Sequence, residues 1–177
     1  MIGYNFGVMT RRSRVLWLPA LLAVALAAGA QWKRAPLQAP AQINPQLYRA
    51  DANATGDINR ALAAAVKQRK RVLLDFGGNW CLDCHILENA FHQPRIAPLL
   101  NDNFIVVHVD VGRYDKNLGL AKKYHVNLEK GVPSLAVLNA RGAVLYATGD
   151  FERAHVMSED DVIAFLDKWK PPAAPKK

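Results

Sequence analysis

The sequence predicts one α/β domain with a mixed central sheet of four to five strands, flanked by helices and with an extra N-terminal helix. Apolar runs rich in β-branched residues at 72–76 and 104–110 have the length of buried strands, and helical segments separate them. Strands joined through helices pair in parallel. Residues 133–139 and 143–148 flank a glycine-containing turn and predict an antiparallel hairpin at the sheet edge. A fifth strand, if formed, lies near Tyr48.

Apolar spacing, capping residues and prolines place five helical segments around the sheet. They are expected at 57–70, 81–91, 95–100, 115–124 and 158–169. Asp57 is the expected N-cap of the first, and Ser158 with Asp161 forms an approximate capping box at the last. The expected buried positions are Ile58, Leu62, Ala65 and Val66 in the first helix and Leu82, Ile86, Leu87, Ala90 and Phe91 in the second.

The first 30 residues have the three parts of an export signal. A basic start at 11–14 precedes an apolar stretch, and Ala28-Gly29-Ala30 has the small residues of a cleavage site. The apolar stretch is shorter than the roughly 20 residues that span a bilayer. Its length therefore favours cleavage after Ala30 over a retained membrane anchor at residues 11–30.

The rest of the chain is expected to form one domain at 47–170. Residues 31–46, rich in Pro, Ala and Gln, predict a flexible tether, and residues 171–177 predict a disordered tail. Three basic residues lie in the first 30 residues, where there is no acidic residue, and the domain has no Lys/Arg run interleaved with aromatics. The net charge of +8 therefore does not predict nucleic-acid binding.

Cys81 and Cys84 are the only cysteines of the chain and mark the candidate functional site. Gly77-Gly78-Asn79 breaks the preceding strand, so a helix is expected to begin at the cysteines. Cysteines three apart at a helix start share one face, and the helix dipole stabilises a thiolate on the first. A disulfide across so short a loop constrains the unfolded chain little, so the pair predicts a redox centre rather than a structural bridge.

Residues 48–170 resemble the thioredoxin fold in several independent features. These are Asp75-Phe76 in a strand, Trp80-Cys81-x-x-Cys84 at a helix start, and Gly131-Val132-Pro133-Ser134 before a hairpin. With its extra N-terminal helix and export signal, the chain is most similar to exported, periplasmic thiol:disulfide interchange reductases such as the C-terminal domain of DsbD.

The resemblance implies a catalytic role for four matching residues. Cys81 would be the exposed nucleophile, and Cys84 the more buried resolving thiol. Asp75 would be a buried carboxylate that assists proton transfer, and Pro133 a cis proline that faces the disulfide.

The same resemblance implies a substrate groove bordered by Trp80, Val132 and Gly149. The chain departs from the family at two places. Val106 is expected where a lysine usually partners the buried carboxylate, and residues 127–130 lengthen the approach to the proline. These departures affect proton handling at the carboxylate and the width of the groove.

The predicted function is reduction of disulfides in extracytoplasmic proteins by dithiol exchange. Leu82 and Asp83, between the cysteines, add an apolar group and a negative charge, which disfavour an unusually stable thiolate. We therefore expect a Cys81 pKa like that of thioredoxin, and a reductant rather than an oxidase. The expected partners are protein disulfides and a membrane or periplasmic dithiol electron donor. We expect a monomer without a cofactor.

Two other functions remain open on the residues alone. Cys81, Cys84 and His85, with His92 two helical turns further on, could bind copper or zinc in a metal-handling protein. The string from Cys81 to His85 also matches the attachment motif of a c-type haem. In the redox interpretation His85 is a surface residue of the helix, and an isomerase is the alternative within the fold.

Overall fold

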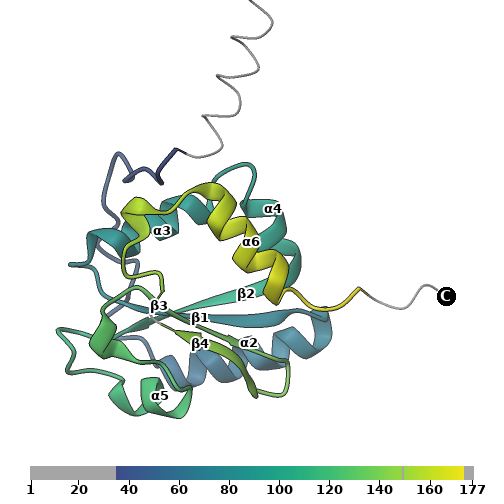
Figure 1. The fold of residues 1–177 in the computed structure, drawn as a ribbon. Helices are drawn as coiled ribbons and strands as arrows, with labels where there is room; N and C mark the ends of the chain where they lie inside the picture. The colour runs from purple at the N-terminus through teal and green to yellow at the C-terminus, as the bar shows by residue number, and fades with distance from the viewer. Residues whose placement is uncertain (1–34, 149, 174–177) are drawn as a thin grey trace, which may run out of the picture. The chain divides into compact units, whose positions relative to one another are not determined.

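A four-stranded mixed sheet with helices on both faces forms the domain (Figure 1). A computed structural model describes residues 35–148 and 150–173. The strands, in spatial order β2-β1-β3-β4, are β1 (Arg71–Gly77), β2 (Phe104–Asp110), β3 (Ser134–Leu138) and β4 (Val144–Thr148). β1 and β2 pair in parallel, whereas β3 pairs antiparallel with both β1 and β4. The predicted parallel pair and hairpin are confirmed, and β3 joins that hairpin to the centre of the sheet.

The helices divide between the two faces of the sheet. Figure 1 shows α3, α4 and α6 on one face and α2 and α5 on the other. Their bounds are α2 (Ala54–Gln68), α3 (Leu82–Phe91), α4 (Ala97–Asn103), α5 (Leu118–Lys123) and α6 (Glu159–Trp169), with short 3-10 helices η1 (Leu128–Lys130) and η2 (Ala154–Val156). The capping box predicted at Ser158 and Asp161 is present.

Strand β1 lies in the middle of the core because both of its faces are covered. Val72, Leu74 and Phe76 are fully buried in the apolar cluster that includes α2. Leu73 is fully buried in the second cluster, with residues of α3, α4 and α6. Burial on both faces explains why this strand is a continuous apolar run instead of an alternating one. Asp75 is the one charged residue between these positions.

Helix α2 begins earlier than predicted, because Asn53 rather than Asp57 is its N-cap. The Asn53 side chain accepts a hydrogen bond from the Gly56 N–H at 2.9 Å. Asp57 lies in the first turn instead, where it forms ion pairs with Arg49 and Arg60. Asn and Asp have nearly equal preferences for the N-cap, so the sequence alone does not separate the two positions.

Two apolar side chains that were expected in the core are exposed. Val66 is 61% exposed and Leu82 is 56% exposed. The inward face of α2 follows Ala54, Ile58, Ala61 and Ala65, and Val66 falls beside that face. Leu82 stands at the first position of α3, at the exposed end of the helix.

Part of the segment predicted as a flexible tether packs on the domain. Leu37 is 7% exposed in the cluster that includes α6, and its N–H donates to the Met157 carbonyl at 2.7 Å. Pro36 forms an isolated antiparallel bridge with Ser158. In the described ranges no fifth strand forms near Tyr48. A single apolar residue in a Pro-rich stretch has no periodic signal, so the sequence does not indicate this packing.

Four predicted features lie wholly or partly outside the described residues. These are the export signal at 1–30, residues 31–34 of the tether, Gly149, and residues 174–177 of the tail. None of the helices in the described ranges is long and apolar enough to cross a membrane.

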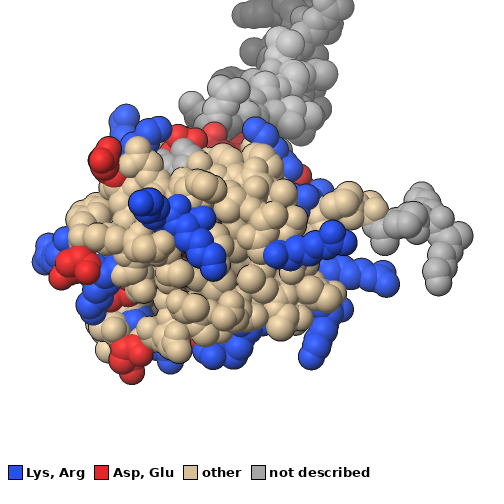
Figure 2. Space-filling model, turned by 90° about the horizontal axis from the view of Figure 1, so that it is seen from below, with Lys and Arg blue, Asp and Glu red and all other residues tan. Residues whose placement is uncertain are grey.

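On the face shown in Figure 2, Lys and Arg side chains are spread apart instead of gathered in one patch, which adds no support for nucleic-acid binding.

Alanine substitution tests the position of the α2 N-cap. Asn53→Ala is expected to lower the free energy of unfolding by about 1 kcal/mol, because it removes the side-chain acceptor of a helix N–H. Asp57→Ala removes partly exposed ion pairs and a favourable contact with the helix dipole, and is expected to cost about 0.5 kcal/mol. Urea unfolding measures both values. A larger loss for Asp57→Ala would place the cap at Asp57.

Candidate active site

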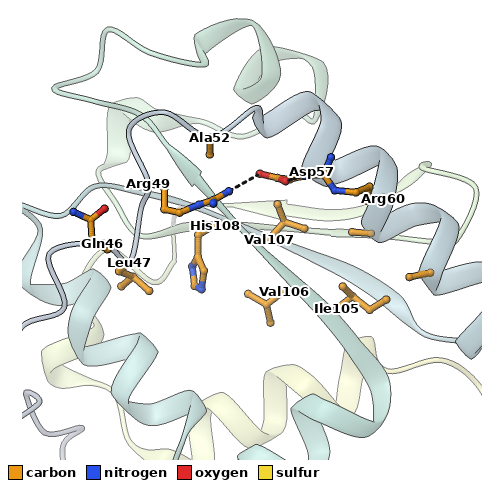
Figure 3. A pocket seen from close by; sticks show the side chains of 12 residues that line it. Gln46, Leu47, Arg49, Ala52, Asp57, Arg60, Ile105, Val106, Val107 and His108 are labelled. Carbon is orange, nitrogen blue, oxygen red and sulfur yellow. Dashed lines mark hydrogen bonds and ion pairs between the residues drawn. The ribbon is translucent and has the colours of Figure 1, made fainter.

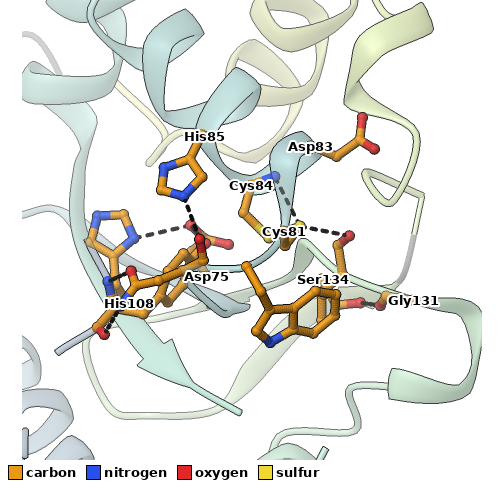
Figure 4. The surroundings of a disulfide bond; sticks show 12 residues. Asp75, Cys81, Asp83, Cys84, His85, His108, Gly131 and Ser134 are labelled. Carbon is orange, nitrogen blue, oxygen red and sulfur yellow. Dashed lines mark hydrogen bonds and ion pairs between the residues drawn. A yellow bond between two sulfur atoms is a disulfide. The ribbon is translucent and has the colours of Figure 1, made fainter. Parts of the chain in front are cut away.

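The disulfide between Cys81 and Cys84 lies where the chain passes from β1 into α3 (Figure 4). Cys81 is the N-cap of α3, and its Sγ accepts a hydrogen bond from the Cys84 N–H at 3.1 Å. The two Cα atoms are 5.3 Å apart. The predicted helix start at the cysteines is confirmed, and an N–H group of its first turn donates a hydrogen bond to the sulfur of Cys81.

Tyr48, from the segment before α2, fixes the position of the residues just before the cysteines. The Asn79 side chain accepts from the Tyr48 N–H at 2.9 Å and donates to the Tyr48 carbonyl at 2.8 Å. At Gly77 an added Cβ would collide with the Tyr48 ring. A glycine is therefore required here for close approach, which explains one of the residues that break the strand.

The two cysteines differ in their surroundings. Cys81, expected to be exposed, is buried at 5% exposure because the loop of Val132 and Pro133 covers it, and Cys84 is fully buried as expected. The Cys81 Sγ lies 3.3 Å from the Val132 carbonyl oxygen, and the Val132–Pro133 peptide bond is cis. The loop that carries Pro133 therefore faces the disulfide from the side of Cys81.

The surface next to Cys81 carries two aromatic side chains, Trp80 and Tyr114. Trp80 is 41% exposed, and its Nε1 donates to the Gly112 carbonyl at 2.6 Å. The Tyr114 ring lies 5.6 Å from the Trp80 ring, and the Arg113 guanidinium lies 5.3 Å above it. Tyr114 and Arg113 belong to this surface, and no motif in the sequence pointed to them. Their position depends on the turn that follows β2.

Residues between α5 and β3 form the other border of the disulfide. Asn127 caps η1, the short helix that occupies the segment predicted to lengthen the approach to the proline. The Ser134 hydroxyl donates to the Gly131 carbonyl at 2.7 Å, which closes the turn around Pro133. Gly149, the third expected groove residue, lies outside the described ranges.

Asp75 is a fully buried carboxyl group in β1. Its Oδ2 accepts a hydrogen bond from the Tyr48 hydroxyl at 2.7 Å and lies 3.0 Å from His108 Nδ1. Its Oδ1 has no hydrogen-bond partner within the described residues. Figure 4 shows His108 on the side of Asp75 away from the two cysteines.

The neighbour of Asp75 on β2 is His108, not Val106 as expected. In the parallel register of β1 and β2, Asp75 is opposite His108 and Val106 is opposite Leu73. Val106 packs against the apolar cluster of Leu73 instead. The expectation was two residues out of register, and two residues is one full repeat of a strand, so Val106 and His108 share a face.

The pKa of His108 is raised above its usual value. Burial is the largest single influence and lowers the pKa, but the hydrogen bond and charge of Asp75, with the charge of Glu88, outweigh it. The pKa of Tyr48 is raised well above its usual value, first by burial and then by the charge of Asp75. The hydroxyl of Tyr48 therefore stays protonated and donates to Asp75.

Asp83, between the cysteines, is bound to η2. Its Oδ1 accepts from the His155 N–H at 2.8 Å and lies 2.7 Å from His155 Nδ1. The carboxylate thus holds the segment after β4 against the start of α3. From the sequence, Asp83 was expected only to place a charge near the thiols; the structure adds this contact with His155.

His85 is buried, not a surface residue as expected. It is 3% exposed, and its Nε2 lies 3.0 Å from the Asn79 carbonyl oxygen. The described residues contain no group of three His, Cys, Asp or Glu side chains that could hold a metal ion. A ring nitrogen engaged by the backbone gives no support to a metal or haem ligand at His85. Neither the metal site nor the haem attachment site is supported by an observation in the described residues.

Comparison with known proteins agrees with this geometry. Residues 53–140 match the thioredoxin-like family. A crystal structure described as a disulphide isomerase from Xylella fastidiosa Temecula1 superimposes with a TM-score of 0.67 at 35% identity, over 72% of this chain and 98% of that one. This chain belongs to the thioredoxin-like family.

Other thioredoxin-like relatives are longer or more distant. The thiol:disulfide interchange protein DsbD of Vibrio cholerae is 32% identical over 110 residues, which are 61% of this chain and 18% of that protein. The chain thus spans less than a fifth of that relative's length. The oxidised C-terminal domain of DsbD from Neisseria meningitidis has a TM-score of 0.50 at 21% identity, over 66% of this chain and 96% of that one. That likeness shows the shared fold alone, and the predicted thioredoxin fold is confirmed.

His108→Gln tests the contact between His108 and Asp75. Because the pKa of His108 is raised on folding, the charged imidazole stabilises the folded state below about pH 6.5. This contribution is lost as the pH rises through the folded-state pKa. The stability difference between the wild type and His108→Gln is therefore expected to shrink with rising pH. Urea unfolding of both oxidised proteins from about pH 5 to about pH 9 measures it. A difference that grows with pH contradicts the pair.

Proposed function

We propose that this chain is an exported thiol-disulfide oxidoreductase that reduces disulfides of extracytoplasmic proteins through Cys81 and Cys84. The observation that carries the proposal is the bonded pair at the start of α3, with Cys81 Sγ 3.3 Å from the Val132 carbonyl. Relatives named as a disulphide isomerase and as the interchange protein DsbD support the same class of chemistry.

The reaction begins on the reduced protein. A thiolate on Cys81 attacks a substrate disulfide and forms a mixed disulfide. The Cys84 N–H and the positive end of α3 stabilise the charge on the attacking sulfur. Cys84 then attacks Cys81, which releases the reduced substrate and leaves the disulfide seen here. A dithiol donor in the membrane or the periplasm restores the reduced protein by the reverse exchange.

Asp75 is proposed to accept the proton of Cys84 before the second attack. Asp75 and Cys84 are both fully buried and lie in the same site (Figure 4), and a general base must reach the proton that it removes. The unpartnered Oδ1 supports the role, since Oδ2 is already engaged by Tyr48 and His108.

The substrate is proposed to be an extended protein segment that carries a disulfide. Trp80 offers an exposed apolar face, and the backbone at Val132 and Pro133 lies beside Cys81, where it can pair with the backbone of the segment. Gly149 is proposed as a further border of this groove. We propose that the protein acts as a monomer.

The compartment is proposed from the sequence before the domain. The export signal at 1–30 would direct the chain to the periplasm or another extracytoplasmic compartment. Cleavage after Ala30 would release the domain, whereas retention of residues 11–30 would hold it at the membrane.

Cys84→Ala is expected to trap substrates as mixed disulfides in the exporting cell. Without the resolving thiol, an adduct on Cys81 cannot be displaced from within the protein, so covalent complexes should accumulate. Mass spectrometry of the proteins released by a reductant identifies the substrates.

The double variant Cys81→Ala/Cys84→Ala is the matched control for the trap and should capture nothing. An empty trap in Cys84→Ala, or equal capture by the control, counts against dithiol exchange. An empty trap together with copper or zinc bound to the wild type would favour metal handling.

The Cys81 pKa is expected to resemble that of thioredoxin and not the strongly lowered value of DsbA. The physical reason is that Asp75 and Asp83 both oppose a further negative charge nearby. Thiolate absorbance of the reduced protein against pH measures it, with Cys81→Ala to assign the transition. A Cys81 thiolate that persists far into the acid range, as in DsbA, would indicate an oxidase.

A further inference from the structure

A line of carboxyl and imidazole groups runs from the buried Asp75 to the surface. His108 Nδ1 lies 3.0 Å from Asp75 Oδ2, and His108 Nε2 lies 3.5 Å from Glu88 Oε2. The other carboxylate oxygen of Glu88 lies 3.6 Å from His92 Nδ1. Side-chain exposure rises along the line, from 0% at Asp75 to 23% at Glu88 and 73% at His92.

A proton delivered to Asp75 needs a way out. Asp75 is fully buried, so a proton taken from Cys84 cannot pass directly to water. In the described residues, the side chains that hydrogen-bond to the carboxyl group are those of Tyr48 and His108. The Tyr48 hydroxyl keeps its proton, because burial and the charge of Asp75 raise its pKa. His108 is the neighbour that can accept a proton on one ring nitrogen and release one from the other.

We propose that His108 carries the proton of the resolving step from Asp75 to Glu88 at the surface, and so acts on the thiols only through Asp75. The inference rests on the proposed thiol-disulfide exchange and names the route by which its proton leaves. Its two contacts lie on opposite ring nitrogens, one toward each carboxyl group.

The resolving step takes place in the mixed disulfide. Cys84 gives its proton to Asp75, and its thiolate forms a bond with the Cys81 sulfur while the bond from Cys81 to the substrate sulfur breaks. The substrate leaves as a thiolate and takes a proton from water, so its disulfide is reduced as the dithiol of the protein is oxidised. Asp75 then passes its proton to Nδ1 of a neutral His108 that carries its own proton on Nε2, and the Nε2 proton moves to Glu88 and from there to water.

A surface pocket along β2 is lined by residues of α2 and of β2, His108 among them (Figure 3). Its volume is about 440 Å³, and its charged lining residues are Arg49, Asp57 and Arg60. The Tyr48 ring packs edge-on against His108, 5.3 Å away. The His108 side chain is 23% exposed, so the space left by a shortened side chain would open to solvent, and a small base from solution could reach Asp75.

The experiment follows the two steps of exchange separately. The reduced full chain is mixed in a stopped-flow instrument with an aromatic disulfide that releases a coloured thiolate at each step. The first release reports attack by Cys81, and the second reports closure by Cys84. The variants are His108→Ala, with and without added imidazole, and His108→Gln, which keeps a hydrogen-bond donor but cannot carry a proton.

His108→Ala is expected to leave the first release unchanged and to slow the second by about tenfold near neutral pH, a modest general-base effect. Imidazole should restore the second release in proportion to its concentration. His108→Gln should slow the second release without recovery, because its side chain fills the space. His125→Asn, a change at an exposed histidine in the left-handed region that Asn tolerates, is the matched control and should behave as the wild type.

Three results overturn the inference. They are a normal second release in His108→Ala, a slowed release that imidazole does not restore, and a normal second release in His108→Gln. The His108→Gln result decides alone if His108→Ala fails to fold. If the wild type releases no coloured thiolate at all, the proposed function itself fails, which separates that outcome from failure of the proton route.

Discussion

A carboxyl group buried in the middle of the sheet is the constraint on which the rest of the site depends. Asp75 stands between apolar residues in β1 and is fully buried. A buried carboxyl group needs hydrogen-bond donors inside the protein. Burial removes its hydrogen bonds to water, and leaving them unreplaced costs free energy. Tyr48 and His108 meet Oδ2, and each comes from a different part of the chain.

Satisfying this carboxyl group draws three distant segments together. Tyr48 lies before α2 and also braces Asn79, just ahead of the cysteines. His108 comes from β2, whose parallel pairing with β1 sets it opposite Asp75. The segment that carries Tyr48 is therefore part of the site rather than a connection to it, and the same contacts that bury Asp75 position the start of α3.

The two cysteines consequently meet different surroundings although only two residues separate them. Cys81 faces the loop of Pro133 and retains some exposure, while Cys84 is fully buried. A protein that exchanges disulfides needs one sulfur that a substrate can reach and one that acts only from within. The N-cap position of Cys81 supports this division, because it places the first sulfur at the helix end and Cys84 inside the first turn.

The local features of the fold were largely predictable. The strands at β1 and β2, the hairpin, the helix start at the cysteines and the capping box of α6 all follow from short-range patterns of apolar, turn and capping residues. Capping preferences did not separate Asn53 from Asp57, since both residue types suit the position. The packing of Leu37 gave no signal, because a single apolar residue has no period.

The sequence by itself determined that two thiols stand at the mouth of a helix behind a buried strand, because spacing and strand-breaking glycines act locally. Only the tertiary structure decided which residues surround them. His108 rather than Val106 meets Asp75, Asp83 binds His155, and His85 is buried against Asn79. Strand register and helix docking depend on how whole elements pack, and a shift of one strand repeat exchanges a valine for an imidazole without changing the apolar pattern.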